Sequence, residues 1–304
     1  MARLSSIGTI IVAAATLVAC SGGVTDSPAI DESLASNIPW TRLSGRIAYS
    51  SGCGGGGTCI YVIDAGTRTV RVVRRYEDSP IITDVAWSPD GSLIYYAILS
   101  FRSASSWVVE SVRLDGIVAS IASSIATQPA IARDGRIAFV SQSGSSFPRV
   151  CIVGGTCLEL ISLNVHSRPA WSPNGASILV ALGESLYELP LQGGPPRAIL
   201  RASETPVRES FTEPTFTRDG ARFAYVRRSS ASTIETEIWS AASDGTDARR
   251  LIAGGANEQP AWSHDGARIL YRIDNRIVLA NADGTQPITV IQPTVFLNSV
   301  AWAP

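Results

Sequence analysis

The sequence contains no lysine, so all 25 of its basic residues are arginines. This absence excludes a lysine Schiff base to a carbonyl substrate and the lysine of a phosphate-binding loop. The formal net charge is −1, whereas a nucleic-acid-binding surface requires a clear excess of basic residues. We therefore expect no nucleic-acid partner.

The motifs of common enzymes are also missing. No Gly-x-Ser-x-Gly nucleophile motif is present, and the glycine run at residues 54–57 is not followed by Gly-Lys-Ser/Thr. Of the two histidines, His264 occupies a position expected in a turn. His166 precedes Pro169 in a connection, where a solvated side chain and a role at a channel mouth both remain open. We predict no catalytic residue, no cofactor and no metal site.

The sequence has no extended helical periodicity, and its one signal-like apolar run covers residues 7–18. This run is too short to span a bilayer comfortably and is typical of a signal peptide. It leads into Leu-Val-Ala-Cys at residues 17–20, which resembles a bacterial lipobox. The resemblance implies a signal peptide at 1–19, lipidation of Cys20 and export to the cell envelope. An ordinary signal peptide with a chance cysteine is the alternative.

Residues 20–44 then read as the lipidated N-terminus and a flexible tether, rich in serine, glycine, alanine and proline. By analogy with lipoproteins, the uncharged Ser21 favours the outer membrane, with the protein facing the periplasm or the cell surface. The lipid is the one membrane attachment that we expect.

The remaining four cysteines form two local pairs with the same spacing, Cys53 with Cys59 and Cys151 with Cys157. Both pairs end in Gly-Gly-Thr-Cys, and glycine allows the chain to fold back so that two cysteines can meet. Exported proteins usually pair an even number of cysteines. We predict two disulfides; free thiols and a metal site are the alternatives, although the spacing matches no common zinc motif.

A repeat decides the fold. Val-Ala-Trp-Ser-Pro-Asp-Gly at residues 85–91 recurs as Pro-Ala-Trp-Ser-Pro-Asn-Gly at 169–175 and Pro-Ala-Trp-Ser-His-Asp-Gly at 260–266, with weaker copies at 129–135 and 214–220. The apolar residues that anchor these copies recur every 40 to 46 residues, the length of one four-stranded propeller blade. They are Trp87, Ile131, Trp171, Phe216, Trp262 and Trp302.

Each copy predicts one blade. The anchoring residue ends a short inner strand, Pro-Asp-Gly forms a tight turn, and an apolar second strand follows. Asp-Gly pairs at residues 115–116, 244–245 and 283–284 predict the hairpin between the third and fourth strands. We expect an all-β, six-bladed propeller of four-stranded antiparallel blades over residues 45–304. The C-terminal Val-Ala-Trp-Ala-Pro would supply the inner strand of the first blade and close the ring; residues 39–41 are the competing candidate.

These repeats resemble the TolB-type propeller repeat (the PD40 type of WD40-like repeat) and lack the Gly-His and Trp-Asp pairs of WD40 itself. The likeness extends over residues 45–304 and includes the terminal Ala-Trp-Ala-Pro. It implies a propeller that binds a protein. TolB carries an α/β domain before its propeller and is soluble in the periplasm, whereas we expect a short tether and a lipid here. The resemblance therefore implies a TolB-like binding propeller that lacks part of the TolB role.

A set of polar residues is predicted to bind the partner. The residue three positions before each anchor begins an inner strand and should face the central channel, forming a ring at its mouth. The ring consists of Asp84, Gln128, Arg168, Glu213, Gln259 and Ser299. Its mixed charges suit a protein or peptide partner better than an anionic ligand; a hydrated rim without a partner is the alternative. We expect a monomeric, non-enzymatic binding protein, with an envelope enzyme or a carbohydrate- or metal-binding propeller as the competing hypothesis.

Overall fold

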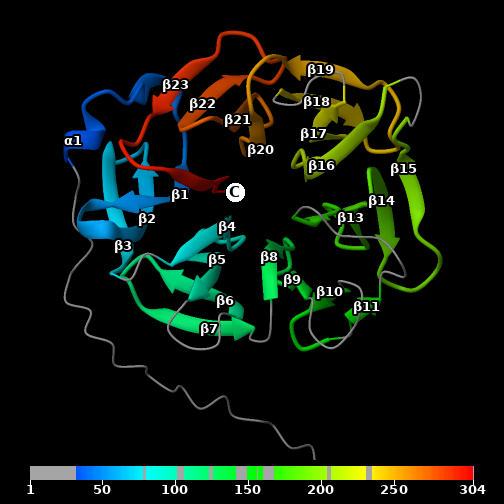
Figure 1. The fold of residues 1–304 in the computed structure, drawn as a ribbon, viewed down its shortest axis with the longest axis horizontal. Coiled ribbons are helices and arrows are strands. Elements are labelled where there is room, and N and C mark those ends of the chain that lie inside the picture. The colour runs from blue at the N-terminus through cyan, green and yellow to red at the C-terminus, as the bar shows by residue number, and fades with distance from the viewer. Residues whose placement is uncertain are drawn as a thin grey trace, which may run out of the picture.

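Six four-stranded antiparallel sheets surround a central axis like the blades of a propeller (Figure 1). The computed structural model describes residues 32–77, 80–100, 106–122, 126–141, 149–155, 157–159, 168–203, 207–230 and 235–303. The few helical turns in this part of the chain are α1 (Glu32–Ala35), η1 (Trp40–Arg42) and η2 (Gly54–Gly56). The predicted all-β, six-bladed architecture is confirmed.

The strands of each blade are given from the axis outwards. Blade 1 contains β24 (Leu297–Trp302), β1 (Arg46–Cys53), β2 (Gly57–Asp64) and β3 (Thr69–Tyr76). Blade 2 contains β4 (Ile81–Trp87), β5 (Leu93–Ser100), β6 (Ser106–Arg113) and β7 (Val118–Ala122). Blade 3 contains β8 (Ala126–Ile131), β9 (Ile137–Ser141), β10 (Arg149–Ile152) and β11 (Cys157–Glu159). Blade 4 contains β12 (Ala170–Trp171), β13 (Ser177–Leu182), β14 (Ser185–Pro190) and β15 (Arg197–Leu200). Blade 5 contains β16 (Glu209–Phe216), β17 (Arg222–Ser229), β18 (Thr236–Ala242) and β19 (Arg249–Ile252). Blade 6 contains β20 (Asn257–Trp262), β21 (Arg268–Ile273), β22 (Arg276–Asn281) and β23 (Ile288–Ile291).

The repeated Ser/Thr-x-Asp/Asn-Gly segment forms the turn between the first two strands of a blade. In blade 2, Asp90 accepts hydrogen bonds from the Ser88 hydroxyl at 2.6 Å and from the backbone N–H of Ser92 at 3.0 Å. Gly91 takes a φ of 66°, in the left-handed region that glycine tolerates. Blades 5 and 6 repeat the hydroxyl–carboxylate contact. The aspartates of these turns therefore recur for a structural reason, as the sequence indicated.

The hydrophobic core lies between adjacent blades. The sheets pack face to face, so each apolar cluster draws on two neighbours, as blades 1 and 2 share one around Tyr96 and Trp87. Trp87 is wedged against blade 1, where its indole N–H points to the carbonyl of Ala301 at 3.4 Å and Arg46 lies over its ring. Trp171 makes the equivalent contacts from blade 4 to blade 3. The anchoring tryptophans thus hold blades together.

The C-terminal strand closes the ring. β24 pairs antiparallel with β1, with Trp302 opposite Ile47 and Val300 opposite Tyr49, and in Figure 1 it approaches the axis at the centre. The inner strands of successive blades contact one another around the ring, including β20 with β24. Residues 40–42 form a short 3-10 helix instead of a strand. The predicted closure by the C-terminus is confirmed.

The end of the predicted tether packs against the propeller. Ile38 is 5% exposed and belongs to the core cluster between blades 6 and 1, with Leu34, Trp40 and Leu43 packed against that cluster. The indole N–H of Trp40 donates to the carbonyl of Ala35 at 3.2 Å. Residues 34–43 are thus an apolar extension of blade 1. Cys20 and His166 lie outside the described residues.

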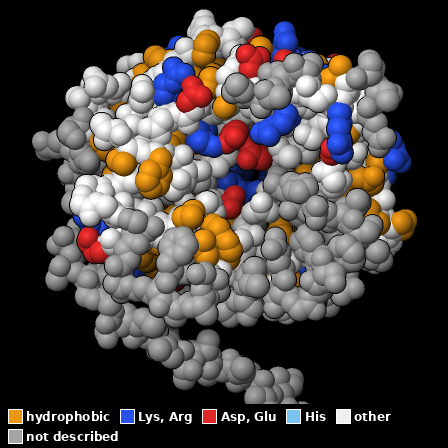
Figure 2. All heavy atoms as spheres, viewed as in Figure 1, with side chains coloured by type: hydrophobic (Ala, Val, Ile, Leu, Met, Phe, Trp, Pro, Cys, Tyr) orange, Lys and Arg blue, Asp and Glu red, His pale blue; other side chains and the backbone are white. Residues whose placement is uncertain are grey.

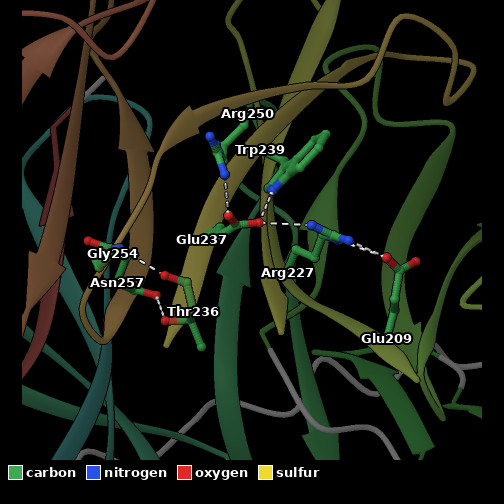
Figure 3. A network of polar contacts seen from close by, with 8 residues as sticks. All are labelled: Glu209, Arg227, Thr236, Glu237, Trp239, Arg250, Gly254 and Asn257. Carbon is green, nitrogen blue, oxygen red and sulfur yellow. Dashed lines mark hydrogen bonds and ion pairs between the residues drawn. The ribbon is translucent and has the colours of Figure 1, made fainter. Parts of the chain in front are cut away.

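Blade 5 carries a ladder of charges across all four of its strands (Figure 3). Arg227 on β17 bonds Glu209 on β16 and Glu237 on β18, the latter at 2.9 Å, and Arg250 on β19 reaches Glu237 at 2.8 Å. Burial opposes the charge on Glu237, but hydrogen bonds from Arg250, Trp239 and Arg227 outweigh it and hold the pKa of this carboxyl below its ordinary value. The ladder therefore connects all four strands of blade 5 through their side chains.

Two disulfides join Cys53 to Cys59 and Cys151 to Cys157, as predicted. Each closes a hairpin, the first between β1 and β2 and the second between β10 and β11, where the two cysteines lie directly opposite each other. None of the helices in the described ranges is both long and apolar enough to cross a membrane.

Candidate functional site

A bulge in the inner strand directs the predicted ring residues towards the axis. In blades 2, 3, 5 and 6 the pairing with the second strand shifts at this position. The bulged residues have positive φ values of 53° to 56°, and they are Asp84, Gln128, Glu213 and Gln259. This conformation costs a residue with a side chain about 1 kcal/mol or more. The bulge occurs at the same position in four blades, so it belongs to the design of the repeat. Bulges of this kind change the direction of a side chain and are common near functional sites.

Five of the ring residues make polar contacts in two groups, which meet on β24. Arg168 of blade 4 places its Nη2 atom 3.7 Å from Asp84 of blade 2 and 3.4 Å from the Ser299 hydroxyl of blade 1. The same hydroxyl accepts the backbone N–H of Val85 at 3.0 Å. Arg168 therefore links three blades around the axis, and the ring lies inside the channel.

The second group joins blades 5, 6 and 1. Glu213 accepts the backbone N–H of Gln259 at 2.5 Å. The side chain of Gln259 donates to the carbonyl of Asn298 at 3.0 Å and accepts the backbone N–H of Val300 at 2.9 Å. Five of the six predicted residues thus make hydrogen bonds or ion pairs across blade boundaries, while Gln128 lies at its bulge with its side-chain oxygen buried.

Burial shifts the pKa of one ring carboxyl and of an arginine beside the ring. Desolvation raises the pKa of the Glu213 carboxyl, against the lowering effects of the Gln259 N–H and of the charges of Arg168 and Arg272. Burial likewise lowers the pKa of Arg272, which contacts Glu258 beside the ring. A carboxyl group with a raised pKa beside a guanidinium group is a feature of functional sites as well as of structural networks.

Several polar atoms of this region are buried without a partner. Within the described ranges, the atoms near the ring that make no hydrogen bond are Gln128 Oε1, Arg168 Nε, Arg272 Nε and Asn298 Nδ2. Buried polar atoms are normally satisfied, so such a group requires an explanation, for which a bound ligand or ordered water qualifies. Figure 2 shows acidic and basic side chains gathered around the centre of one face of the molecule.

A cavity of about 280 Å³ opens onto the ring. Its floor contains Asp84, Arg168, Glu213 and Gln259, and its wall consists of small and apolar residues from the inner strands of several blades. At its outer end lie Arg133 and Arg218, in the turns that follow the inner strands. We call this end the turn-side mouth. The cavity can therefore hold a slender group between a charged floor and a basic rim.

The basic rim was missed by the sequence analysis. Arg133 and Arg218 stand two residues after their anchors, at the position of Pro89 and Pro173, and this shared register was the available signal. His264 occupies the same position in blade 6 and lies in the turn, as predicted, with its Nδ1 atom 2.6 Å from Arg218 Nη1. Among the residues that the structure describes, no cluster of histidine, cysteine and carboxylate side chains could hold a metal ion.

Solved structures with the same propeller architecture include two described as TolB and an oligogalacturonate lyase. TolB from Acinetobacter baumannii superimposes with a TM-score of 0.72 at 19% identity, over 88% of this chain and 69% of that one. A putative TolB from Agrobacterium tumefaciens gives 0.58 at 20% identity, over 86% and 100%. An oligogalacturonate lyase in complex with manganese gives 0.55 at 14% identity, over 88% and 85%.

No protein-family model and no curated protein matches the sequence. The structural likenesses therefore show the fold: the chain is a TolB-like six-bladed β-propeller. Both binding proteins and enzymes share this architecture, so the site must carry the functional argument.

Proposed function

We propose that the protein is a non-enzymatic, lipid-anchored envelope protein whose propeller binds a protein or peptide partner at the channel mouth. The observation that carries this proposal is the cavity above the Asp84–Arg168–Glu213 floor. Floor residues of both charges offer donors and acceptors, which match the mixed groups of a peptide. The rigid ring of blades holds them in place, as binding sites on propellers and barrels require.

The cellular setting rests on the N-terminus. Leu-Val-Ala-Cys at residues 17–20 is the basis for lipidation of Cys20, and the two hairpin disulfides suit an oxidising compartment. We propose an outer-membrane location and a monomeric propeller. A partner in the envelope would then meet a channel held near the membrane by residues 20–33.

One pair of variants tests partner binding. Asp84→Asn with Arg168→Gln removes both members of the floor ion pair together, so that neither charge is left without the other. The control, Glu188→Gln with Arg197→Gln, removes a 2.7 Å ion pair from the strands β14 and β15 of blade 4, away from the axis. Each protein is crosslinked in cells and purified, and its adducts are identified by mass spectrometry. A partner recovered with the wild type and the control but lost from the floor variant supports the proposal. Equal recovery from all three proteins contradicts it.

An enzyme is the competing function, favoured by the buried Glu213 carboxyl with its raised pKa beside Arg168. It is tested with polysaccharide lyase and peptidase substrates, with and without manganese. Turnover that disappears in Glu213→Gln would replace the binding function with a catalytic one.

A further inference from the structure

Two arginines and a histidine line the turn-side mouth, and the nearest acids, Asp219 and Asp265, line an adjoining hollow. A second hollow of about 420 Å³ lies at this mouth, and its lining includes Arg133, Arg218 and His264 together with Trp87, Phe216 and Trp302. No aspartate or glutamate lines it. The charges of the deeper floor are mixed, so the rim differs from the floor in chemistry.

The two arginines are held by neutral acceptors. Arg133 of blade 3 reaches over the mouth and donates from Nη2 to the backbone carbonyl of Arg218 in blade 5. Arg218 in turn donates from Nη1 to Nδ1 of His264 in blade 6 at 2.6 Å. Among the described residues, no carboxylate forms an ion pair with either guanidinium group. Each guanidinium has five N–H donors, so both keep donors in the fork geometry that fits a carboxylate.

The nearest acids are already engaged in their own turns. Asp219 accepts the Thr217 hydroxyl at 2.6 Å and the backbone N–H of Ala221 at 3.0 Å. These hydrogen bonds, the Thr217 hydroxyl first, hold the pKa of Asp219 below its ordinary value, and the charge of Arg133 adds a minor effect. Asp265 is held in the same way by Ser263. Their carboxylates are therefore committed to turns, which leaves the two rim cations for a ligand.

The wall between rim and floor favours a peptide over a sugar. A sugar site would present broad exposed aromatic faces, but Trp87, Trp171 and Trp302 are 6% to 8% exposed. Their indole N–H groups point to backbone carbonyls. Phe216 and Trp262 are partly exposed at the mouth. The rest of the wall consists mainly of alanine and proline, including Ala86, Ala170, Ala261, Pro169 and Pro260. Such a narrow apolar passage fits an aliphatic side chain or an extended backbone.

We propose that the turn-side mouth recognises an acidic peptide segment, with Arg133 and Arg218 holding a carboxylate while an adjoining apolar residue enters the passage. This inference rests on the proposed partner-binding function and names the chemistry of the partner. The rim supplies the charge complementarity, and Arg168 lines the same cavity at its floor, where the entering segment would meet it.

The test measures binding of a fluorescent peptide of alternating glutamate and leucine residues, with a glutamine–leucine peptide ending in an amide as its neutral match. The protein is the full chain in detergent, as wild type, as Arg133→Gln with Arg218→Gln, and as the control Arg201→Gln, which removes an exposed arginine outside the mouth. Equal melting temperatures establish that the variants fold. We expect the double variant to bind the acidic peptide about tenfold or more weakly, because it loses the charged hydrogen bonds to the carboxylate. Arg201→Gln should leave the affinity unchanged, and added salt should weaken it.

Three results would overturn the inference: equal binding of the neutral peptide, an equal loss in Arg201→Gln, or tighter binding of inorganic phosphate or an oligogalacturonate than of the peptide at the same mouth. Failure here is distinct from failure of the proposed function. A cellular partner could be lost from the Asp84→Asn, Arg168→Gln variant and still bind the Arg133→Gln, Arg218→Gln variant normally. That result would support partner binding and contradict the acidic-peptide inference.

Discussion

The carboxylate of Glu213 in blade 5 accepts a 2.5 Å hydrogen bond from the backbone N–H of Gln259 in blade 6. Both residues have a φ of 53°, and both stand at the bulge of their inner strand. The bond therefore connects the strained positions of two neighbouring blades beside the cavity. A substitution of Glu213 in blade 5 therefore removes or alters a contact of blade 6.

The charge of Glu213 should reduce stability at neutral pH. Burial raises the pKa of Glu213 in the folded state above its unfolded value. Ionisation of Glu213 therefore lowers the free energy of unfolding as pH rises above the unfolded pKa. We expect Glu213→Gln, which keeps the acceptor for the Gln259 N–H, to melt at a higher temperature than the wild type at pH 7.5. The difference should vanish at a pH below the ordinary glutamate pKa. Melting curves across that range check this; a lower melting temperature of the variant at pH 7.5 would refute it.

Glu237 should show the opposite sign. Its pKa is lowered in the fold by Arg250, Trp239 and Arg227 despite its burial, so its contribution is present above the unfolded pKa and is lost as pH falls through the folded pKa. Glu237→Gln should therefore melt lower than the wild type at pH 7.5, with a gap that narrows in acid. The same curves measure both variants, and equal signs for Glu213 and Glu237 would contradict the account.

A glycine in an outer turn should be required for blade packing. Gly284 has a φ of 82°, and a Cβ there would lie 2.0 Å from the backbone oxygen of Leu251 in the preceding blade. Gly135 has a φ of 87° with open space around it. Gly135→Ala should cost about 1 kcal/mol, from the left-handed backbone alone. Gly284→Ala should cost clearly more stability, because blade 6 must move to relieve the contact. Urea denaturation measures the free energy of unfolding of both variants, and equal losses would contradict the close contact.

Closure of the ring should depend on Trp302. Its side chain is 8% exposed, and its indole N–H donates to the carbonyl of Ser44 at 2.8 Å. Trp302→Ala should cost about 3–5 kcal/mol, a large part of a total stability of about 5–15 kcal/mol. Trp40 lies partly buried on the same core cluster but outside the sheet. Trp40→Ala should therefore cost less, and a larger loss from Trp40 than from Trp302 would count against closure by the C-terminus.

Each disulfide should contribute modestly. Both join cysteines six positions apart, and in the chain-entropy description a loop this short is worth about 2 kcal/mol. Cys53→Ser with Cys59→Ser should lower the melting temperature without loss of fold. Peptide mapping of the wild type without reductant should yield both linked pairs; free thiols at these positions would contradict the structure.

Lipidation is predicted to depend on Cys20. Cys20→Ala should abolish labelling by a fatty-acid analogue and release the protein from membranes. Equal labelling of the variant and the wild type would exclude the anchor.

The fold could be derived from the sequence because its determinants are local and repeated. Trp87, Trp171 and Trp302 marked the blades, and the Asp-Gly pairs marked the outer hairpins. The bulges at Asp84 and Glu213 could not be derived, since nothing in an Asp or Glu side chain predicts a left-handed backbone. They place the ring within the channel.

The basic rim could not be predicted from the sequence either. Arg133 and Arg218 are two blades apart, and only the closed ring brings them together. The packing of residues 34–43 had a visible signal in Leu34, Ile38 and Trp40, which the polar composition of the preceding segment outweighed.

The central claim, that a partner occupies the turn-side mouth, is tested most directly by photo-crosslinking in the native cells. A photoreactive residue replaces Pro173 at the mouth in one protein and the exposed Ile117, in the outer hairpin of blade 2, in the other. The account predicts a discrete protein adduct from position 173 that is absent from position 117 and is lost when Arg133→Gln and Arg218→Gln are added. Adducts of equal yield at both positions, or none at position 173, would contradict it.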